Sequence, residues 1–115
     1  MIRTTRQISW LKGARKDFET FPVEAQIEMG RALSIVAEGR YPDTAKPFKG
    51  AGSGVFELAL RHRGEAYRVV YAVQIGPDIW VLHAFQKKSK SGIKTPKMEV
   101  DLIHERLKRL KEMLS

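Results

Sequence analysis

The sequence has no cysteine, which excludes a disulfide scaffold, a thiolate metal site and a cysteine nucleophile. It also has no apolar run approaching the roughly 18 residues of a membrane-spanning helix. The segment Met1–Trp10 carries Arg3 and Arg6 with no apolar stretch behind them, unlike a secretory signal. We therefore expect a cytoplasmic protein without a membrane anchor.

Patterns of metal ligands and of catalytic triads are also missing. The three histidines, His62, His83 and His104, show no His-x-x-x-His spacing, and no Ser/His/Asp arrangement is apparent. His83 lies inside an apolar segment, where a histidine is more often part of the core than a catalytic base. The sequence predicts neither a metal site nor a cofactor.

Acidic residues are the minority among the charged ones. Twenty-one Lys and Arg against thirteen Asp and Glu give a net charge of +8 and an isoelectric point near 10.0. This balance favours a polyanionic partner, such as nucleic acid, an acidic protein or a membrane surface, over a protein that is merely soluble and basic. A length of 115 residues without a linker or a repeat indicates one domain, residues 1–115.

Apolar residues at helical spacing mark the first part of the chain, after a stretch, residues 2–8, that could form a short strand. A first helix is predicted from Ser9, its N-cap, to Phe21. Pro22 then begins a second helix that ends at Gly39. The residues predicted to face inward from this second helix are Val23, Ile27, Leu33, Val36 and Ala37.

Strand patterns dominate the second part of the chain. Residues 39–54 are predicted to form a loop with at most one short strand in residues 46–49. The β-rich runs 55–60, 67–74 and 79–85 follow, separated by connections of hairpin length, and should form an antiparallel meander. The last run is apolar on both faces and is therefore expected to be a central strand.

A closing helix is predicted from Thr95 and Pro96, which suit the N-cap and N1 positions. Its apolar stripe is expected to comprise Met98, Leu102, Ile103, Leu107, Leu110 and Leu114. The fold class predicted is α+β, a twisted antiparallel sheet with two N-terminal helices on one face and a C-terminal helix.

Arg68 is a lone cation within a β-rich run. Side chains alternate along a strand, so Arg68 points to the face that Tyr67 and Val69 do not occupy. We expect this to be the open face of the sheet. An arginine fixed there could stabilise the charge of a phosphate in transfer. The alternative is a structural arginine paired with Glu57 or Glu65 on a neighbouring strand.

Lysines gather between Asp78 and Glu99, where no acidic residue intervenes. Such a run of positively charged residues favours contact with phosphates. The alternative is a solvated loop that aids solubility. Two further lysines precede a glycine-rich segment, residues 50–54, which lacks the spacing of a P-loop and reads more readily as a hairpin loop. The lysines of these two groups are Lys87, Lys88, Lys90, Lys94 and Lys97, and Lys46 and Lys49.

Several of these motifs together resemble one family, the RelE/HigB superfamily of toxins from bacterial type II toxin–antitoxin modules, in particular its phage-derived HigB-like subgroup. The resemblance spans nearly the whole chain in order. It is carried by Ala45-Lys46-Pro47-Phe48-Lys49-Gly50, Gly54-Val55-Phe56-Glu57-Leu58, Tyr67-Arg68-Val69-Val70-Tyr71, Val81-Leu82-His83-Ala84-Phe85-Gln86-Lys87-Lys88-Ser89-Lys90 and Thr95-Pro96.

The resemblance implies a RelE-like (microbial RNase-like) fold and metal-independent cleavage of mRNA, usually on the ribosome, by attack of a 2′-hydroxyl on the adjacent phosphate. It also implies an antitoxin from an adjacent gene, often a helix-turn-helix protein, that binds the toxin in a hetero-oligomer. mRNA and the ribosome then become the expected partners. Arg68 matches the arginine that contacts the scissile phosphate, and Lys49, Lys87 and Lys88 match basic residues of the active site.

The sequence departs from the superfamily pattern at two places. Ala59 stands where many relatives carry an arginine, and the C-terminus lacks the Tyr or His that several relatives use as acid or base. Lys87, Lys88 or His83 could donate the proton instead. Lys46, Lys90, Lys94 and Lys97 are assigned to binding RNA. Two alternatives stay open, a ParE-like gyrase inhibitor on the same fold and a non-catalytic basic module that binds RNA or protein.

Overall fold

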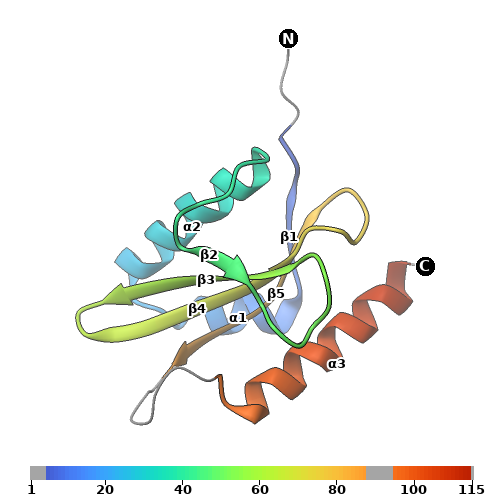
Figure 1. Cartoon of the computed structure of the whole chain (residues 1–115). Helices are drawn as coiled ribbons and strands as arrows, with labels where there is room; N and C mark the ends of the chain where they lie inside the picture. The colour runs from blue at the N-terminus through green and yellow to red at the C-terminus, as the bar shows by residue number, and fades with distance from the viewer. Residues whose placement is uncertain (1–4, 88–94, 115) are drawn as a thin grey trace.

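The structure is a computed structural model that describes residues 5–87 and 95–114. Within these residues it contains a five-stranded sheet with the strand order β1-β5-β4-β3-β2 (Figure 1). The strands are β1 (Ile8–Trp10), β2 (Ala45–Pro47), β3 (Val55–His62), β4 (Glu65–Ala72) and β5 (Ile79–Lys87). The helices are α1 (Lys12–Phe18), α2 (Val23–Ala37) and α3 (Lys97–Leu114).

The three long strands form the antiparallel meander that the sequence predicts. β3 and β4 pair from Val55 opposite Ala72 to His62 opposite Glu65. Two residues with positive φ, Arg63 at 50° and Gly64 at 79°, connect them, as a tight hairpin turn between twisted strands requires. β5 lies inside the sheet, between β4 and β1, which confirms its expected central place.

The first strand adds a parallel pair to this sheet, because Ile8 lies opposite Ile79 and Trp10 opposite Val81. Ser9 belongs to β1, so its prediction as a helix N-cap is wrong. Its hydroxyl donates to Asp78 Oδ2 at 2.6 Å, and α1 begins only after Leu11. The backbone bonds that β1 makes with β5 fix Ser9 in an extended conformation, which outweighs its local preference for a cap.

α1 and α2 cover one face of the sheet, where they bury Tyr67, Val69 and Tyr71. The inward side of α2 was predicted only in part. Ala25, Met29, Leu33 and Val36 are buried at spacings of four, four and three residues, whereas Val23 and Ile27 are 67% and 50% exposed. These two positions lie on a different side of the helix, and their expected burial is wrong.

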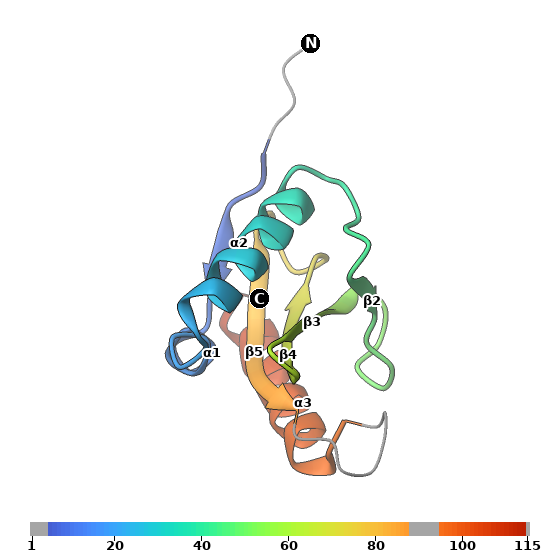
Figure 2. The same ribbon diagram turned by 90° about the vertical axis from the view of Figure 1, so that its left-hand side faces the viewer.

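α3 packs on the opposite face, so the two faces carry different helices (Figure 2). Ile103, Leu107 and Leu110 are buried against the sheet, while Met98 and Leu114, predicted at the ends of the stripe, are 78% and 47% exposed. The sequence predicted that the face carrying Arg68 would be open. This prediction is wrong, because part of that face lies beneath α3. No helix within the described residues has the length and apolarity to cross a bilayer.

An irregularity in β5 decides which of its residues lie under α3. Val70 is opposite His83 but Tyr71 is opposite Val81, so Leu82 is an extra residue in the ladder. Such a bulge reverses the alternation of side chains beyond it. Lys87, which strict alternation from Ile79 would place on the α1–α2 face, is therefore on the face of Arg68.

Candidate active site

Three cations surround one carboxylate on the α3 face of the sheet. Arg68 of β4 donates from Nη1 to Oε1 of Glu57 on β3, and Lys46 Nζ of β2 lies 4.0 Å from the same oxygen. Lys87, at the end of β5, is near enough to the other three for each of them to shift its pKa. We call Lys46, Glu57, Arg68 and Lys87 the basic cluster.

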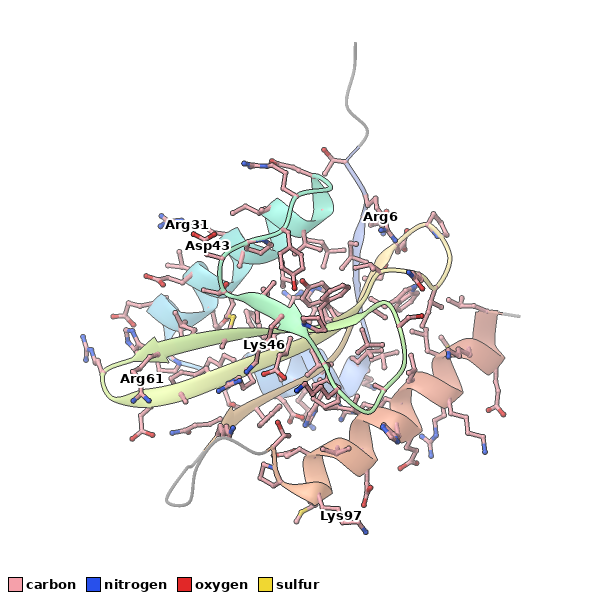
Figure 3. All side chains as sticks on the ribbon, in the orientation of Figure 1. Arg6, Arg31, Asp43, Lys46, Arg61 and Lys97 are labelled. Carbon is pink, nitrogen blue, oxygen red and sulfur yellow. The ribbon has the colours of Figure 1, made fainter. Side chains whose placement is uncertain are left out.

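Each member of the basic cluster comes from a different strand, which explains why their proximity is not evident from sequence spacing. Lys46 faces Glu57 directly in the β2–β3 register, and Arg68 lies on the adjacent strand. Figure 3 marks Lys46 on edge strand β2, Arg61 toward the β3–β4 turn and Lys97 at the start of α3. Strand pairing thus brings residues together that are up to 41 positions apart.

Burial increases from the rim of the basic cluster to its centre. The side chain of Lys46 is 58% exposed, that of Arg68 15% and that of Glu57 8%. Arg68 Nε is buried and has no hydrogen-bond partner among the described residues. A guanidinium held in this way is preorganised, so that it does not have to be ordered when an anion arrives.

The electrostatics of Lys87 differ from those of a surface lysine. Burial lowers its pKa below the ordinary value, and the nearby Arg68 lowers it further, whereas Glu57 raises it. With Glu57 ionised, three cations face a single carboxylate, so the cluster keeps excess positive charge. A lysine whose pKa is lowered in this way gives up its proton more readily than one in water.

Glu57 is the member of the cluster that sequence reasoning missed as a functional residue. The sequence indicates it only as one of two structural partners for Arg68, and the structure shows that pairing. Glu65, the other candidate, instead accepts a hydrogen bond from Gln86 at 2.7 Å on the opposite face. The signal that could have found Glu57 is the β2–β3 register, which sets an acidic residue opposite Lys46.

Among the other predicted lysines, the two that the structure describes, Lys49 and Lys97, are not members of the basic cluster. Lys49 is exposed in the loop beyond β2, and Lys97 is at the exposed start of α3, 3.7 Å from Asp101. Lys88, Lys90 and Lys94 lie outside the described residues.

His83 occupies a different place, between α1, β5 and α3. Its Nε2 is 2.7 Å from Glu99 Oε1, and Arg106 Nη1 donates to its Nδ1 at 2.9 Å and to the Leu82 carbonyl. Asp17 lies 4.0 Å away, and burial lowers the pKa of the ring. Both ring nitrogens are therefore engaged in attaching α3 to the sheet, so the structure separates His83 from the basic cluster.

Comparison with known proteins places the chain in a family. It matches the family model described as "Phage derived protein Gp49-like" over residues 16–108. The chain belongs to this family. The comparison with curated proteins gave no match.

Among solved structures, this Gp49-like chain is similar to a mutant of the E. coli toxin RelE in the free state. The TM-score is 0.61 at 18% sequence identity, and the match covers 91% of this chain and 97% of the other. It is also similar to a chain of the RelBE2 toxin–antitoxin complex from Mycobacterium tuberculosis, with a TM-score of 0.45, 20% identity and coverage of 76% and 98%. The RelE match shows the fold, and with the family match it confirms the resemblance indicated by the motifs.

Side chains that could bind a metal do not gather in the described part of the Gp49-like protein. Among residues 5–87 and 95–114, no group of three or more His, Asp or Glu side chains is arranged to hold a metal ion. At the basic cluster, Lys46, Arg68 and Lys87 supply positive charge directly.

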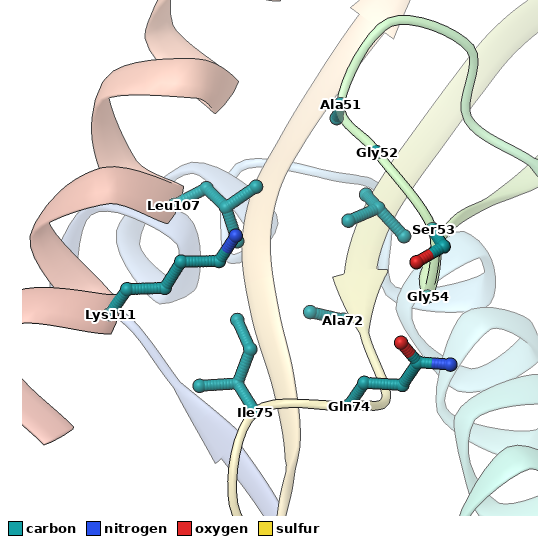
Figure 4. Close-up of a pocket in the computed structure, with 10 residues that line it drawn as sticks. Ala51, Gly52, Ser53, Gly54, Ala72, Gln74, Ile75, Leu107 and Lys111 are labelled. Carbon is teal, nitrogen blue, oxygen red and sulfur yellow. The ribbon is translucent and has the colours of Figure 1, made fainter. Parts of the chain in front are cut away.

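A cavity of about 350 Å³ lies elsewhere on the α3 face of this Gp49-like protein, beside the glycine-rich segment 51–54 (Figure 4). Its lining includes Leu107, Ile75 and Lys111. Gly54 has a φ of 79°, and a Cβ there would come within 2.7 Å of the Gln74 side chain. The positive φ, which other residues rarely adopt, therefore explains this glycine, and the segment forms the loop between β2 and β3.

Proposed function

We propose that this chain is the toxin of a type II toxin–antitoxin module and that it stops translation by cutting mRNA on the ribosome. The observation that carries the proposal is the basic cluster, in which Arg68, Lys87 and Lys46 converge from three strands. The RelE-like fold and the phage-derived family support it. The protein acts in the cytoplasm, where its substrate is made.

The reaction proposed is an internal transphosphorylation that needs no metal. The 2′-hydroxyl of one nucleotide attacks the adjacent phosphorus, and negative charge builds up on the non-bridging oxygens as the 5′-oxygen leaves. Arg68 offers several N–H donors to these oxygens, and Lys87 adds a compact positive charge beside it. Lys87 also donates the proton to the leaving oxygen, since burial and the nearby Arg68 lower its pKa and make that proton easier to give up.

The message and the ribosome are held by the wider positive surface. Lys46 is the exposed member of the basic cluster, Lys49 lies in the loop beyond β2 and Lys97 lies at the start of α3. Lys88, Lys90 and Lys94 belong to the same basic stretch of sequence as Lys97. A net charge of +8 favours binding to ribosomal and messenger phosphates. We further propose an antitoxin, a helix-turn-helix protein from the adjacent gene, that silences the toxin in a hetero-oligomer.

A non-catalytic basic module is the second candidate, and the Glu57–Arg68 ion pair favours it. An arginine that serves only to neutralise a buried glutamate would show this same contact. Such a module would bind RNA or an acidic protein and leave messages intact. A gyrase inhibitor on the same fold would likewise need no phosphate chemistry.

Inducible expression with mapping of mRNA ends tests the proposal. The wild-type protein is expected to stop translation and to produce new 5′ ends within codons. Arg68→Ala should reduce cleavage by about 10²–10³-fold, the loss typical of removing one transition-state hydrogen-bond donor. Arg31→Ala, an exposed arginine on α2 at the other side of the sheet, is the matched control and should cleave normally.

Two results would contradict the nuclease. If messages stay intact during growth arrest and Arg68→Ala is equally toxic, the result would support the non-catalytic basic module. The same result with inhibited gyrase would identify the gyrase inhibitor.

A further inference from the structure

The cavity beside the glycine-rich segment 51–54 shares no lining residue with the basic cluster and has the size of a ligand site. Its volume of about 350 Å³ is at the lower end of the roughly 300–1,000 Å³ found for pockets that take small molecules. Val55 and Ala72, which pair across β3 and β4, line it together with Leu107 of α3. The glycine-rich loop lies across from α3 (Figure 4). Sheet, helix and loop thus form its walls.

The polar groups around the cavity favour an anion. Among the described residues that line it, Lys111 is the one that carries a charge, while Ser53 and Gln74 add a hydroxyl and an amide. Figure 4 shows Lys111 reaching from α3 toward the cavity, with the Ser53 and Gln74 side chains on the opposite side. A single cation with neutral hydrogen-bond donors around it attracts a phosphate rather than a cationic ligand.

The backbone of the loop suits an anion as well. Gly50, Gly52 and Gly54 have φ values of 93°, 86° and 79°, which glycine adopts without strain. They alternate with Ala51 and Ser53, a pattern typical of concavities in which successive N–H groups converge on an anion. A Cβ at Gly50 or Gly52 would meet no atom beyond its chain neighbours within 4 Å. These two glycines therefore serve the direction of the backbone and not close packing.

We propose that this cavity binds one nucleotide, with its phosphate between the glycine-rich loop and Lys111 and its base against Leu107 and Ile75. Leu107 and Ile75 offer apolar surface to the flat face of a base. Ser53 and Gln74 can form hydrogen bonds with the edge of the base or with the ribose. The net charge of +8 raises the concentration of such anions near the protein. This nucleotide site is distinct from the place of cleavage, and binding there needs no reaction.

Two sources of the nucleotide share this chemistry, a free nucleotide and a nucleotide of the bound message. The position of the cavity favours the message. Val55 at the cavity and Glu57 in the basic cluster are two residues apart on the same face of β3, a distance of about 7 Å along the strand. A message bound at Arg68, as proposed above, would then place a neighbouring nucleotide at the cavity. The inference rests on the proposed function for this source alone.

Amide NMR spectra of the full chain, titrated with adenosine 5′-monophosphate (AMP), test the site. AMP can also contact the basic cluster, so the dissociation constant is taken from the signals of Gly52, Ser53 and Gln74 alone. We expect these signals to move in a saturable way. Lys111→Met should weaken the binding that they report by about tenfold, the effect of losing one hydrogen bond to a charged group. Lys12→Met removes the same charge from α1, on the other side of the sheet, and should bind AMP as the wild type does.

A second pair of variants tests the loop backbone. Gly52→Ala places a Cβ on a residue whose φ is 86°, so the loop has to change its course and AMP binding should weaken by about as much as in Lys111→Met. Gly39→Ala is the matched control, because Gly39, just beyond α2, has a φ of 85° and equally open surroundings. It should carry a similar backbone strain and bind AMP normally. Equal affinities of the two variants would show that the phosphate does not use the loop backbone.

Inorganic phosphate, which carries no base, is the second probe. It should bind at the same signals about tenfold more weakly than AMP, the effect of losing roughly 60 Å² of buried apolar surface. Equal affinities for AMP and phosphate would overturn the nucleotide site and leave a simple anion site.

Competition with RNA identifies the source of the nucleotide. A short message analogue with a 2′-deoxy residue at the cleavage site should raise the apparent dissociation constant of AMP at the cavity signals. If bound RNA leaves that constant unchanged, the assignment to the message is overturned. If neither AMP nor RNA moves the cavity signals while the wild type cuts messages, the site fails and the nuclease stands. If AMP binds at the cavity and no message is cut, the site stands and the proposed function is overturned.

Discussion

At the scale of single residues, Glu57 and Arg68 show how structure and chemistry depend on the same contact. Both side chains are largely buried, so each charge has lost most of its hydration and relies on the other. Removing one partner leaves the remaining charge buried without compensation. A loss of activity in a single variant therefore has to be separated from a loss of stability.

A double-mutant cycle on this pair makes that separation. We expect Glu57→Ala and Arg68→Ala each to lower the free energy of unfolding by about 3–5 kcal/mol, the usual cost of breaking a buried ion pair. The double variant should lose less than the sum, by at least roughly 1 kcal/mol, since it leaves no unpaired charge. Urea unfolding at neutral pH measures all three, and additive losses would show that the two side chains are not coupled.

His83 makes the stability of the protein depend on pH. Burial lowers its folded pKa, so as the pH falls through about 6.5 the unfolded chain takes up a proton before the folded chain does. The histidine therefore costs stability below that pH and costs none above it. Glu99 and Asp17, which face the ring, oppose this shift, and Arg106 adds to it.

Thermal unfolding between pH 7.5 and pH 5 is the corresponding measurement. The melting temperature of the wild type is expected to fall as the medium is acidified, and His83→Gln should fall less because it cannot take up the proton. His104→Gln, which changes an exposed histidine of α3, is the control and should follow the wild type. Parallel curves for His83→Gln and the wild type would show that another group causes the acid sensitivity.

At the scale of elements, local patterns predicted most of what depends on neighbouring residues. The β3–β4 hairpin, the end of α2 shortly before Gly39 and the buried residues of α3 follow from turn chemistry and periodicity. The α2 face and the role of Ser9 do not, because both are decided by packing and pairing with distant segments. Ser9 could cap the N-terminus of a helix, but its backbone pairing with β5 places it in a strand.

The bulge in β5 is the element-scale feature that matters most for the site. The run from Ile79 to Phe85 is apolar on both faces, so its sequence gives no sign of where the alternation reverses. Arg68 could be selected from sequence as a lone cation in a strand. The placement of Lys87 beside it depends on the extra residue Leu82, and the contribution of Glu57 depends on the β2–β3 register.

At the scale of the whole molecule, the overall positive charge and the basic cluster are two different features. The charge of +8 is spread over many side chains, whereas the basic cluster holds three cations around one carboxylate. In the proposed function, the exposed lysines outside the centre of the cluster would release counterions from RNA, and this contribution to binding would weaken with salt. Their loss should affect binding more than turnover.

Binding of a message analogue with a 2′-deoxy residue at the cleavage site, measured over a series of salt concentrations, tests this division. Lys97→Ala should weaken binding and reduce the slope of log K against log salt by about 0.7, the value for one contact to a single strand. The control, Lys12→Ala, changes an exposed lysine of α1 on the other side of the sheet and should leave the slope unchanged. An unchanged slope for Lys97→Ala would remove that lysine from the RNA surface.

The chemistry of the cut ends tests the central claim most directly. Purified protein is mixed with ribosomes translating a defined message, and the two new termini are identified by enzymatic end-labelling and mass spectrometry. Attack by the 2′-hydroxyl predicts a 2′,3′-cyclic phosphate on one fragment and a 5′-hydroxyl on the other, both absent with Arg68→Ala. A message that stays whole, or fragments that carry a 5′-phosphate, would contradict the claim.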